Sequence, residues 1–126
     1  MNVLLATLVA CGSADTEPAG ASFTRVQDEI LTPSCAFTSC HAASSGSAGL
    51  DLTAGAAYES LIDAPARDAA GETLVVPGDA LASYLRSKCA DEDDIIGDAM
   101  PIGSEGGLDA ERLALLTAWI DAGALP

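Results

Sequence analysis

Apolar residues recur at helical spacing in four segments of the chain, and few stretches alternate in the way that a half-buried strand does. The first of these segments has one apolar helical face, made of Phe23, Val26, Ile30 and Leu31. Thr24 and Gln27 have the spacing of a capping box, which predicts a helix that starts at Thr24. We expect this helix to end at Pro33, because the residue before a proline is disfavoured in the α region.

Two shorter helices are expected in the middle of the chain. Thr53 is placed to cap the first of them. The apolar residues of that helix are Tyr58, Leu61 and Ile62, and Pro65 follows them. Residues 74–78 form a short extended apolar piece that a Pro-Gly turn closes. Asp79 is placed to cap the second helix. That helix carries Leu81, Tyr84 and Leu85 on one side and Arg86 and Lys88 near its C-terminal end.

The last helix has the clearest pattern. Asp109 is placed as its N-cap, and Leu108 and Leu113 occupy the two positions of a hydrophobic staple. The buried stripe continues through Leu116, Trp119 and Ile120. Gly123 is placed to end the helix in a left-handed cap. The sequence therefore predicts a small all-α fold of four to five short helices joined by long loops.

The N-terminus has the pattern of an export signal. Residues 1–10 are apolar and lead to Cys11, and the residues after it are small, polar and proline-containing, as in a flexible tether. Residues 8–11, Leu-Val-Ala-Cys, resemble a bacterial lipobox, in which the cysteine carries the lipid. We expect a signal peptide at 1–10, a lipidated Cys11, a tether at 11–21 and one domain at 22–126, held in the bacterial periplasm or at the cell surface. The alternative is a cytosolic start with a buried cysteine.

Charge and composition narrow the function. The 126 residues include 19 acidic and 5 basic ones, which gives a formal net charge of -14 with the single histidine neutral. Nucleic acids and anionic lipid headgroups repel such a chain, so only the lipid anchor would bring it to a membrane. Because the chain has a single histidine, metal sites that need two or three histidines are excluded. Apolar residues make up 49% but aromatic residues only 4%, so the core would gain from a large rigid apolar group or a disulfide.

Cys35, Cys40 and His41 are the sharpest candidates for chemistry. A Cys-x2-Cys-His motif attaches c-type haem, because two thiols add to the porphyrin vinyl groups and the histidine ligates the iron; here four residues separate the cysteines. Met100 is the only methionine after Met1 and lies in a glycine-flanked loop, which suits the second axial ligand. The alternative is a disulfide among Cys35, Cys40 and Cys89. In that case His41 is a loop residue and Met100 fills the core.

From about Ser22 to Ala124 the chain resembles the small c-type cytochrome-like domains of bacterial lipoproteins and secreted proteins. The matching pieces are the helix before the cysteines, Cys-x4-Cys-His, Leu50-Asp51-Leu52, Val76-Pro77-Gly78-Asp79, Ser83-Tyr84-Leu85, Met100-Pro101 and the segment from Leu108 to Ala124. The resemblance implies a cytochrome c-like fold, with the first and last helices crossing, and one covalent haem c. It carries over Cys35 and Cys40 as thioether positions, His41 as the proximal ligand and Met100 as the distal ligand.

Two functions follow as hypotheses. The first is a monohaem c-type cytochrome, a single-electron carrier of the cell envelope; it is not an enzyme, because both axial positions of the iron would be filled. Its pocket would be lined by Leu50, Leu52, Val75, Leu85 and Ile102. Its acidic surface would suit a redox partner protein with a basic docking face. The second is a haem-free, disulfide-stapled interaction module of a lipoprotein.

The acidic run at 91–94 lacks the pattern of an EF-hand calcium site and indicates a solvated loop.

Overall fold

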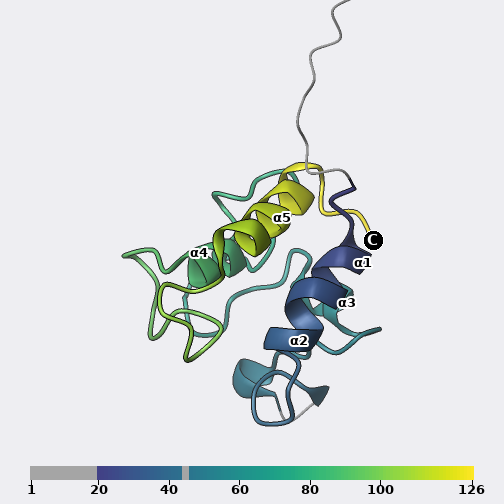
Figure 1. Ribbon diagram of the computed structural model, residues 1–126. Coiled ribbons are helices and arrows are strands. Elements are labelled where there is room, and N and C mark those ends of the chain that lie inside the picture. Colours follow the sequence, from purple (N-terminus) through teal and green to yellow (C-terminus); the bar gives the residue numbers. More distant parts are fainter. Residues whose placement is uncertain (1–19, 44–45) are drawn as a thin grey trace, which may run out of the picture.

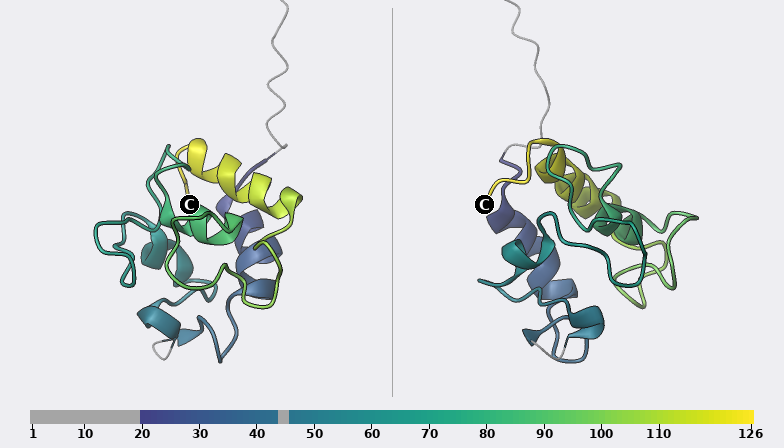
Figure 2. Two further views of the ribbon diagram at one scale, coloured as in Figure 1. Left: turned by 90° about the vertical axis from the view of Figure 1, so that its left-hand side faces the viewer. Right: turned by 180° about the vertical axis from the view of Figure 1, so that it is seen from behind.

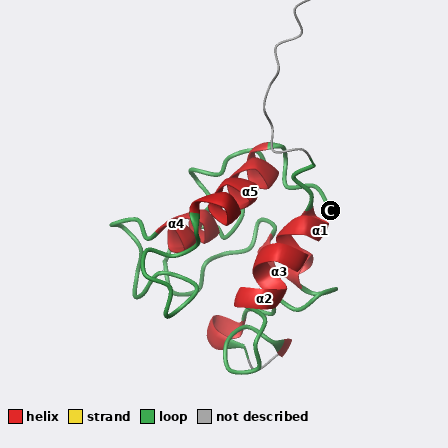
Figure 3. Ribbon diagram, in the orientation of Figure 1, coloured by secondary structure: helices red, strands yellow, loops and turns green. Residues whose placement is uncertain are grey.

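Helices and long loops make up the computed structural model, which describes residues 20–43 and 46–126. In chain order the elements are α1 (Phe23–Val26), the π-helical η1 (Gln27–Leu31), α2 (Thr32–Ser34), the 3-10 helix η3 (Ser47–Gly49), α3 (Ala57–Leu61), α4 (Tyr84–Ala90) and α5 (Ala110–Asp121). In the described ranges β-pairing is limited to isolated bridges, which join Ile62 to Val75, Pro65 to Thr73 and Thr73 to Ser83. Figure 3 shows this composition of helices and loops, and the molecule is mostly α, as predicted.

The expected signal peptide at residues 1–10, the lipid-bearing Cys11 and all but the last residues of the expected tether at 11–21 lie outside the described residues. Among the helices that the structure does describe, none has the length and apolar character needed to cross a bilayer.

The N-terminal helix is capped by Ser22, so the predicted cap at Thr24 is wrong. The Ser22 hydroxyl accepts a hydrogen bond from the amide of Arg25 at 3.3 Å, and α1 begins at Phe23. α1, η1 and α2 then follow one another without a break. Ser22 has the extended backbone angles of an N-cap, so the helix begins one residue before the predicted start. Serine and threonine are similarly good caps, and the sequence has one of each here.

Gln27 and Pro33 also differ from the prediction. The buried Gln27 side chain donates to Thr32 Oγ1 and to the Leu52 carbonyl oxygen, both at 3.0 Å, so it ties the helix to a distant loop and forms no capping box. The helical run continues through Pro33 to Ser34. The preceding turn is π-helical, with the Thr32 amide bonded to the Gln27 carbonyl, and a proline in the first turn of α2 needs no amide hydrogen.

α3 starts later than predicted, because Thr53 does not cap it. The Thr53 hydroxyl donates to Asp51 Oδ1 at 2.6 Å, and Ala56 occupies the N-cap position without a side-chain hydrogen bond. Short polar side chains of this kind bond locally in turns as readily as at helix ends. The predicted extended piece after α3 is present, and Val75 in it bridges to Ile62 in parallel fashion.

α4 is also shorter than predicted. Asp79 Oδ1 accepts from the amide of Ala82 at 3.1 Å in a turn, and the N-cap of α4 is Ser83. Leu81 therefore lies outside the helix and is 80% exposed, so its predicted place on one side of the helix with Tyr84 and Leu85 is wrong. Tyr84 and Leu85 are both buried.

α5 forms as the sequence predicts. Asp109 Oδ1 accepts from the Arg112 amide at 3.0 Å, which satisfies one of the free amides of the first turn. Its inward stripe is buried and consists of Leu115, Leu116, Trp119 and Ile120. Gly123, just beyond the helix, has φ of +111°, a left-handed conformation that a residue without Cβ adopts freely.

α5 contacts both α1 and α4, so the first and last helices of the domain meet (Figure 1). Phe23 of α1 lies with its ring centroid 5.3 Å from that of Trp119 and 5.1 Å from that of Tyr58 on α3. The chain end is tied to this cluster, because Trp119 Nε1 donates to the Leu125 carbonyl and the Tyr58 hydroxyl to the Ala124 carbonyl. Long loops, visible from both sides in Figure 2, connect α3 to α4 and α4 to α5.

Candidate functional site

A cavity of about 410 Å³ contains both His41 and Met100 in its wall. The remaining wall comes from the η3 region, α3 and the loop after it, and α4. Most of it is apolar or neutral: Ser47, Ala48, Gly49, Leu50, Leu52, Ser60, Ala64, Pro65, Ala66, Leu74, Tyr84 and Leu85. The charged wall residues are Glu59, Arg67, Asp68 and Lys88. The two predicted iron ligands therefore share one largely apolar cavity, although they come from distant parts of the sequence.

His41 is held in one tautomer by its neighbour. Its Nδ1 lies 3.1 Å from the Ser47 carbonyl oxygen. A carbonyl can only accept, so this hydrogen bond requires the proton on Nδ1 and leaves the lone pair on Nε2. Metal-bound histidines commonly donate their other ring nitrogen to such an acceptor, which fixes the ring orientation and raises the basicity of the ligand atom.

The loop that carries His41 is folded on itself by backbone hydrogen bonds. The amide of His41 donates to the Cys35 carbonyl at 3.2 Å, and the amide of Leu52 donates to the His41 carbonyl at 2.8 Å. The Ser47 amide donates to the Cys40 carbonyl at 2.6 Å. These bonds hold the histidine, its Ser47 partner and the wall residue Leu52 in one local unit.

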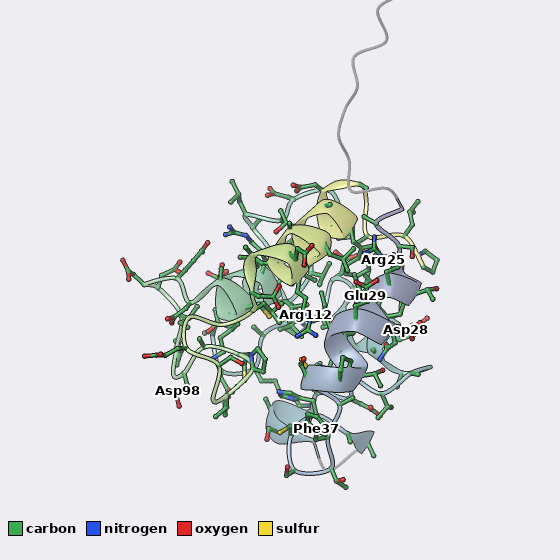
Figure 4. All side chains as sticks on the ribbon, viewed as in Figure 1. Arg25, Asp28, Glu29, Phe37, Asp98 and Arg112 are labelled. Atoms are coloured by element: carbon green, nitrogen blue, oxygen red, sulfur yellow. The ribbon has the colours of Figure 1, made fainter. Side chains whose placement is uncertain are left out.

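Met100 is positioned by α4. Its amide donates to the Lys88 carbonyl at 2.9 Å. The Lys88 ammonium donates to the carbonyl oxygens of Ile96 and Asp98, each at 2.7 Å. Figure 4 shows Asp98 on this loop, beside α4. Both the backbone carbonyl and the side chain of Lys88 thus bind the loop that carries the thioether.

Cys35 and Cys40 lie beside the His41 loop, and neither belongs to the cavity wall that the structure shows. Cys35 is buried, and burial, with the nearby Cys40 as a smaller cause, raises the pKa of its thiol to about 11. Cys89 is also buried; burial, and next the proximity of Cys35, raise its pKa to about 12. All three are free cysteines in the structure. The buried thiols of Cys35 and Cys89, whose pKa values are raised, are poor nucleophiles.

Three of the five predicted pocket residues line the cavity and two do not. Leu50, Leu52 and Leu85 are in the wall. Val75 is fully buried in the main hydrophobic core, and Ile102 is 70% exposed, so the prediction for these two was wrong. Val75 belongs to the short extended piece and Ile102 to the loop after Met100, and apolar character alone does not separate a core position or a loop tip from a cavity wall.

The segment 64–68 is a part of the wall that the sequence did not indicate. It is an Ala- and Pro-containing loop, and only Arg67 stands out in it, as one of five basic residues in an acidic chain. Tyr84 also lines the cavity, and its hydroxyl accepts a hydrogen bond from the Ile96 amide at 3.0 Å. The one sequence feature that could have pointed to this part of the wall is Arg67, a basic residue in a strongly acidic chain.

A second group of charged side chains lies at the surface, outside the cavity. Arg25, Glu29 and Arg112 gather where α1 and α5 come together, with Asp28 nearby, in a surface depression (Figure 4). Arg25 and Glu29 form an exposed ion pair at 2.7 Å. The acidic run 91–94 lies in a loop, as predicted. Across residues 20–43 and 46–126, no three His, Cys, Asp or Glu side chains come together as a metal site would require.

No protein-family model, curated protein or solved structure matches this chain.

Proposed function

We propose that the protein is a monohaem c-type cytochrome-like electron carrier. The observation that carries the proposal is the common cavity of His41 and Met100. An imidazole and a thioether are the axial pair of electron-carrying c-type haems, and the two residues are the only histidine and the only methionine after Met1. Contact between α1 and α5 agrees with the crossing of first and last helices that a cytochrome c-like fold requires.

The residues of the cavity fit a haem. His41 has Nε2 free as a ligand atom, because Nδ1 is bonded to the Ser47 carbonyl. Leu50, Leu52 and Leu85 would contact the porphyrin and exclude water, and Met100 would supply the thioether sulfur. When bound, the haem iron supplies reversible one-electron chemistry, and the protein tunes it through the ligands and the dry surroundings.

Covalent attachment through Cys35 and Cys40 is part of the proposal. Both cysteines are free and adjoin the His41 loop, and the Cys40 thiol is only partly buried. The Cys35 thiol is buried, so attachment at that position requires the 35–40 loop to open while the haem is added. Both axial positions would be occupied by side chains, and we therefore propose an electron carrier and not an enzyme.

The cellular setting follows from the N-terminal pattern. We propose that the chain is exported and held in the periplasm or at the cell surface by a lipid on Cys11. With a formal charge of -14, its natural redox partner would present a basic docking face.

The test is expression of the exported protein together with haem-attachment machinery. Intact mass shows the lipid and the covalent haem together, and a Soret band that survives acid-acetone extraction identifies thioether attachment. A colourless protein with two fewer free thiols would instead support the haem-free, disulfide-stapled interaction module.

A variant pair tests the ligand assignment. His41→Ala should abolish the stable low-spin spectrum even where thioethers form. Thr38→Ala, which changes an exposed residue of the same loop, is the matched control and should keep it. A low-spin spectrum unchanged in His41→Ala would contradict the proposal.

A further inference from the structure

Arg67 is a basic residue whose charge the fold leaves unused. Arg25, Arg86 and Arg112 pair with Glu29, Glu92 and Asp109, and the Lys88 ammonium is bonded to two carbonyl groups. Within residues 20–43 and 46–126, no carboxylate or other acceptor lies in hydrogen-bond or ion-pair range of the Arg67 guanidinium. In a chain with 19 acidic residues, such a guanidinium is conspicuous.

The Arg67 guanidinium lies against the backbone of Gly49, at the wall of the cavity. A Cβ atom at position 49 would be 2.5 Å from Arg67 Nη1 and 2.9 Å from its Cζ. Gly49 also has φ of +65°, a conformation that residues with a Cβ rarely adopt. Because Gly49 has no Cβ atom, the guanidinium can occupy this space. The contact joins η3 to the loop at 64–68.

The position of Arg67 defines the kind of group that it can take. The cavity wall is mostly apolar, whereas Arg67 is itself solvent-exposed, so the guanidinium stands at the edge between cavity and solvent. Glu59 and Asp68 also belong to the wall, and neither pairs with Arg67 in the structure, so its five N–H donors are available to an incoming acceptor. The matching ligand has a large apolar body and a carboxylate at its rim.

We propose that Arg67 binds a propionate carboxylate of the haem, which anchors and orients the porphyrin at the open edge of the cavity. This inference rests on the proposed haem-binding function and adds to it the residue that recognises the acidic side arms. A guanidinium suits this task because it donates two parallel hydrogen bonds to one carboxylate.

Ferric mesohaem and its dimethyl ester test the inference directly. The ethyl groups of mesohaem cannot form thioethers, so the measured affinity is non-covalent, and esterification removes the carboxylate charge. Soret titrations of the thiol-reduced full-length protein should give a dissociation constant about fivefold lower for mesohaem than for the diester, as expected for an exposed ion pair. Arg67→Gln should remove this preference by weakening mesohaem binding alone.

Arg112→Gln is the matched control, because it removes the same charge from a residue outside the cavity wall, and it should keep the preference for the acid form. Arg67→Lys should restore part of it, since the charge returns without the planar fork. An acid-to-ester preference retained in Arg67→Gln would overturn the role of Arg67 while leaving haem binding intact. Absence of a Soret shift with either porphyrin in the unmodified protein would overturn the haem proposal, and this inference with it.

Discussion

The amide of Met100 donates a hydrogen bond to the carbonyl oxygen of Lys88 at 2.9 Å, so the only methionine of the described chain is attached to the end of α4. The Lys88 side chain reinforces this attachment from the same residue, through its bonds to the carbonyls of Ile96 and Asp98. Lys88 is itself in the cavity wall. Its backbone and its side chain therefore both bind the loop that carries the thioether.

Lys88→Met should loosen the Met100 loop. The variant keeps the length of the side chain but loses both ammonium hydrogen bonds. Because both bonds are exposed to water, we expect the two together to contribute about 1.5–3 kcal/mol, the range for a single hydrogen bond to a charged group. Urea unfolding of the protein should show a loss of stability in this range, and the haem-loaded form should show a weaker sulfur-to-iron charge-transfer band. Arg112→Met, which removes an exposed cation elsewhere, should leave that band unchanged. An unchanged band in Lys88→Met would show that the loop holds Met100 without the lysine.

Met100→Ala should change the haem and not only the stability. A neutral thioether favours reduced iron, so its loss should lower the reduction potential and remove the charge-transfer band. Carbon monoxide should then bind the ferrous protein, and Met100→His should restore a low-spin haem at a low potential. Redox titration and visible spectra measure these changes. If Met100 were a core residue instead, truncation would cost about 2–5 kcal/mol and leave the spectrum as it was.

Alkaline pH should destabilise the reduced, haem-free protein through Cys89. Burial raises the pKa of the Cys89 thiol in the folded state to about 12, well above the ordinary value of a cysteine, so the folded state holds the proton more tightly than the unfolded state. The resulting stability is complete below about pH 9 and is lost as the pH rises towards 12, at about 1.4 kcal/mol per pH unit. Denaturant midpoints from pH 8 to 10.5 measure it. Cys89→Ala should show a shallower decline, and equal slopes would contradict the assignment.

Asp109→Ala should destabilise the domain by about 1 kcal/mol, because the Arg112 amide loses its acceptor. For a domain of this size that corresponds to a fall of about 4–8 °C in Tm. Glu111→Ala is the comparison, since Glu111 lies in the same first turn and caps no amide; it should cost less. Thermal unfolding followed by circular dichroism separates the two, and equal losses would mean that general charge at the helix start, not the cap, is responsible.

Electron transfer to a basic partner protein should slow as salt is added. Long-range attraction to a chain of formal charge -14 is screened beyond about 10 Å at 0.1 M ionic strength. Stopped-flow rates with a basic acceptor and with an acidic one, at 20 to 500 mM salt, provide the contrast. A rate that does not depend on salt with the basic acceptor would indicate an apolar docking face.

Local patterns in the sequence were sufficient where neighbouring residues decide the structure. Asp109 and Gly123 mark the ends of α5 correctly, and the stripe of Leu116, Trp119 and Ile120 is buried, because capping and helical periodicity depend on residues a few positions apart. The same patterns misplaced the start of the first helix, where Ser22 and Thr24 are competing caps. They also missed the passage of the helical run through Pro33, since a π-helical turn gives no local signal.

The sequence also singled out His41 and Met100 as chemically distinctive, because each is unique in its type after Met1. Only the tertiary structure brings the two into one cavity wall, gives His41 its Ser47 acceptor and sets Arg67 against Gly49. It likewise sends Val75 to the core and Ile102 to the surface. Each of these outcomes depends on which distant segments pack together, and that is decided by the burial of the whole chain, about which local spacing carries no information.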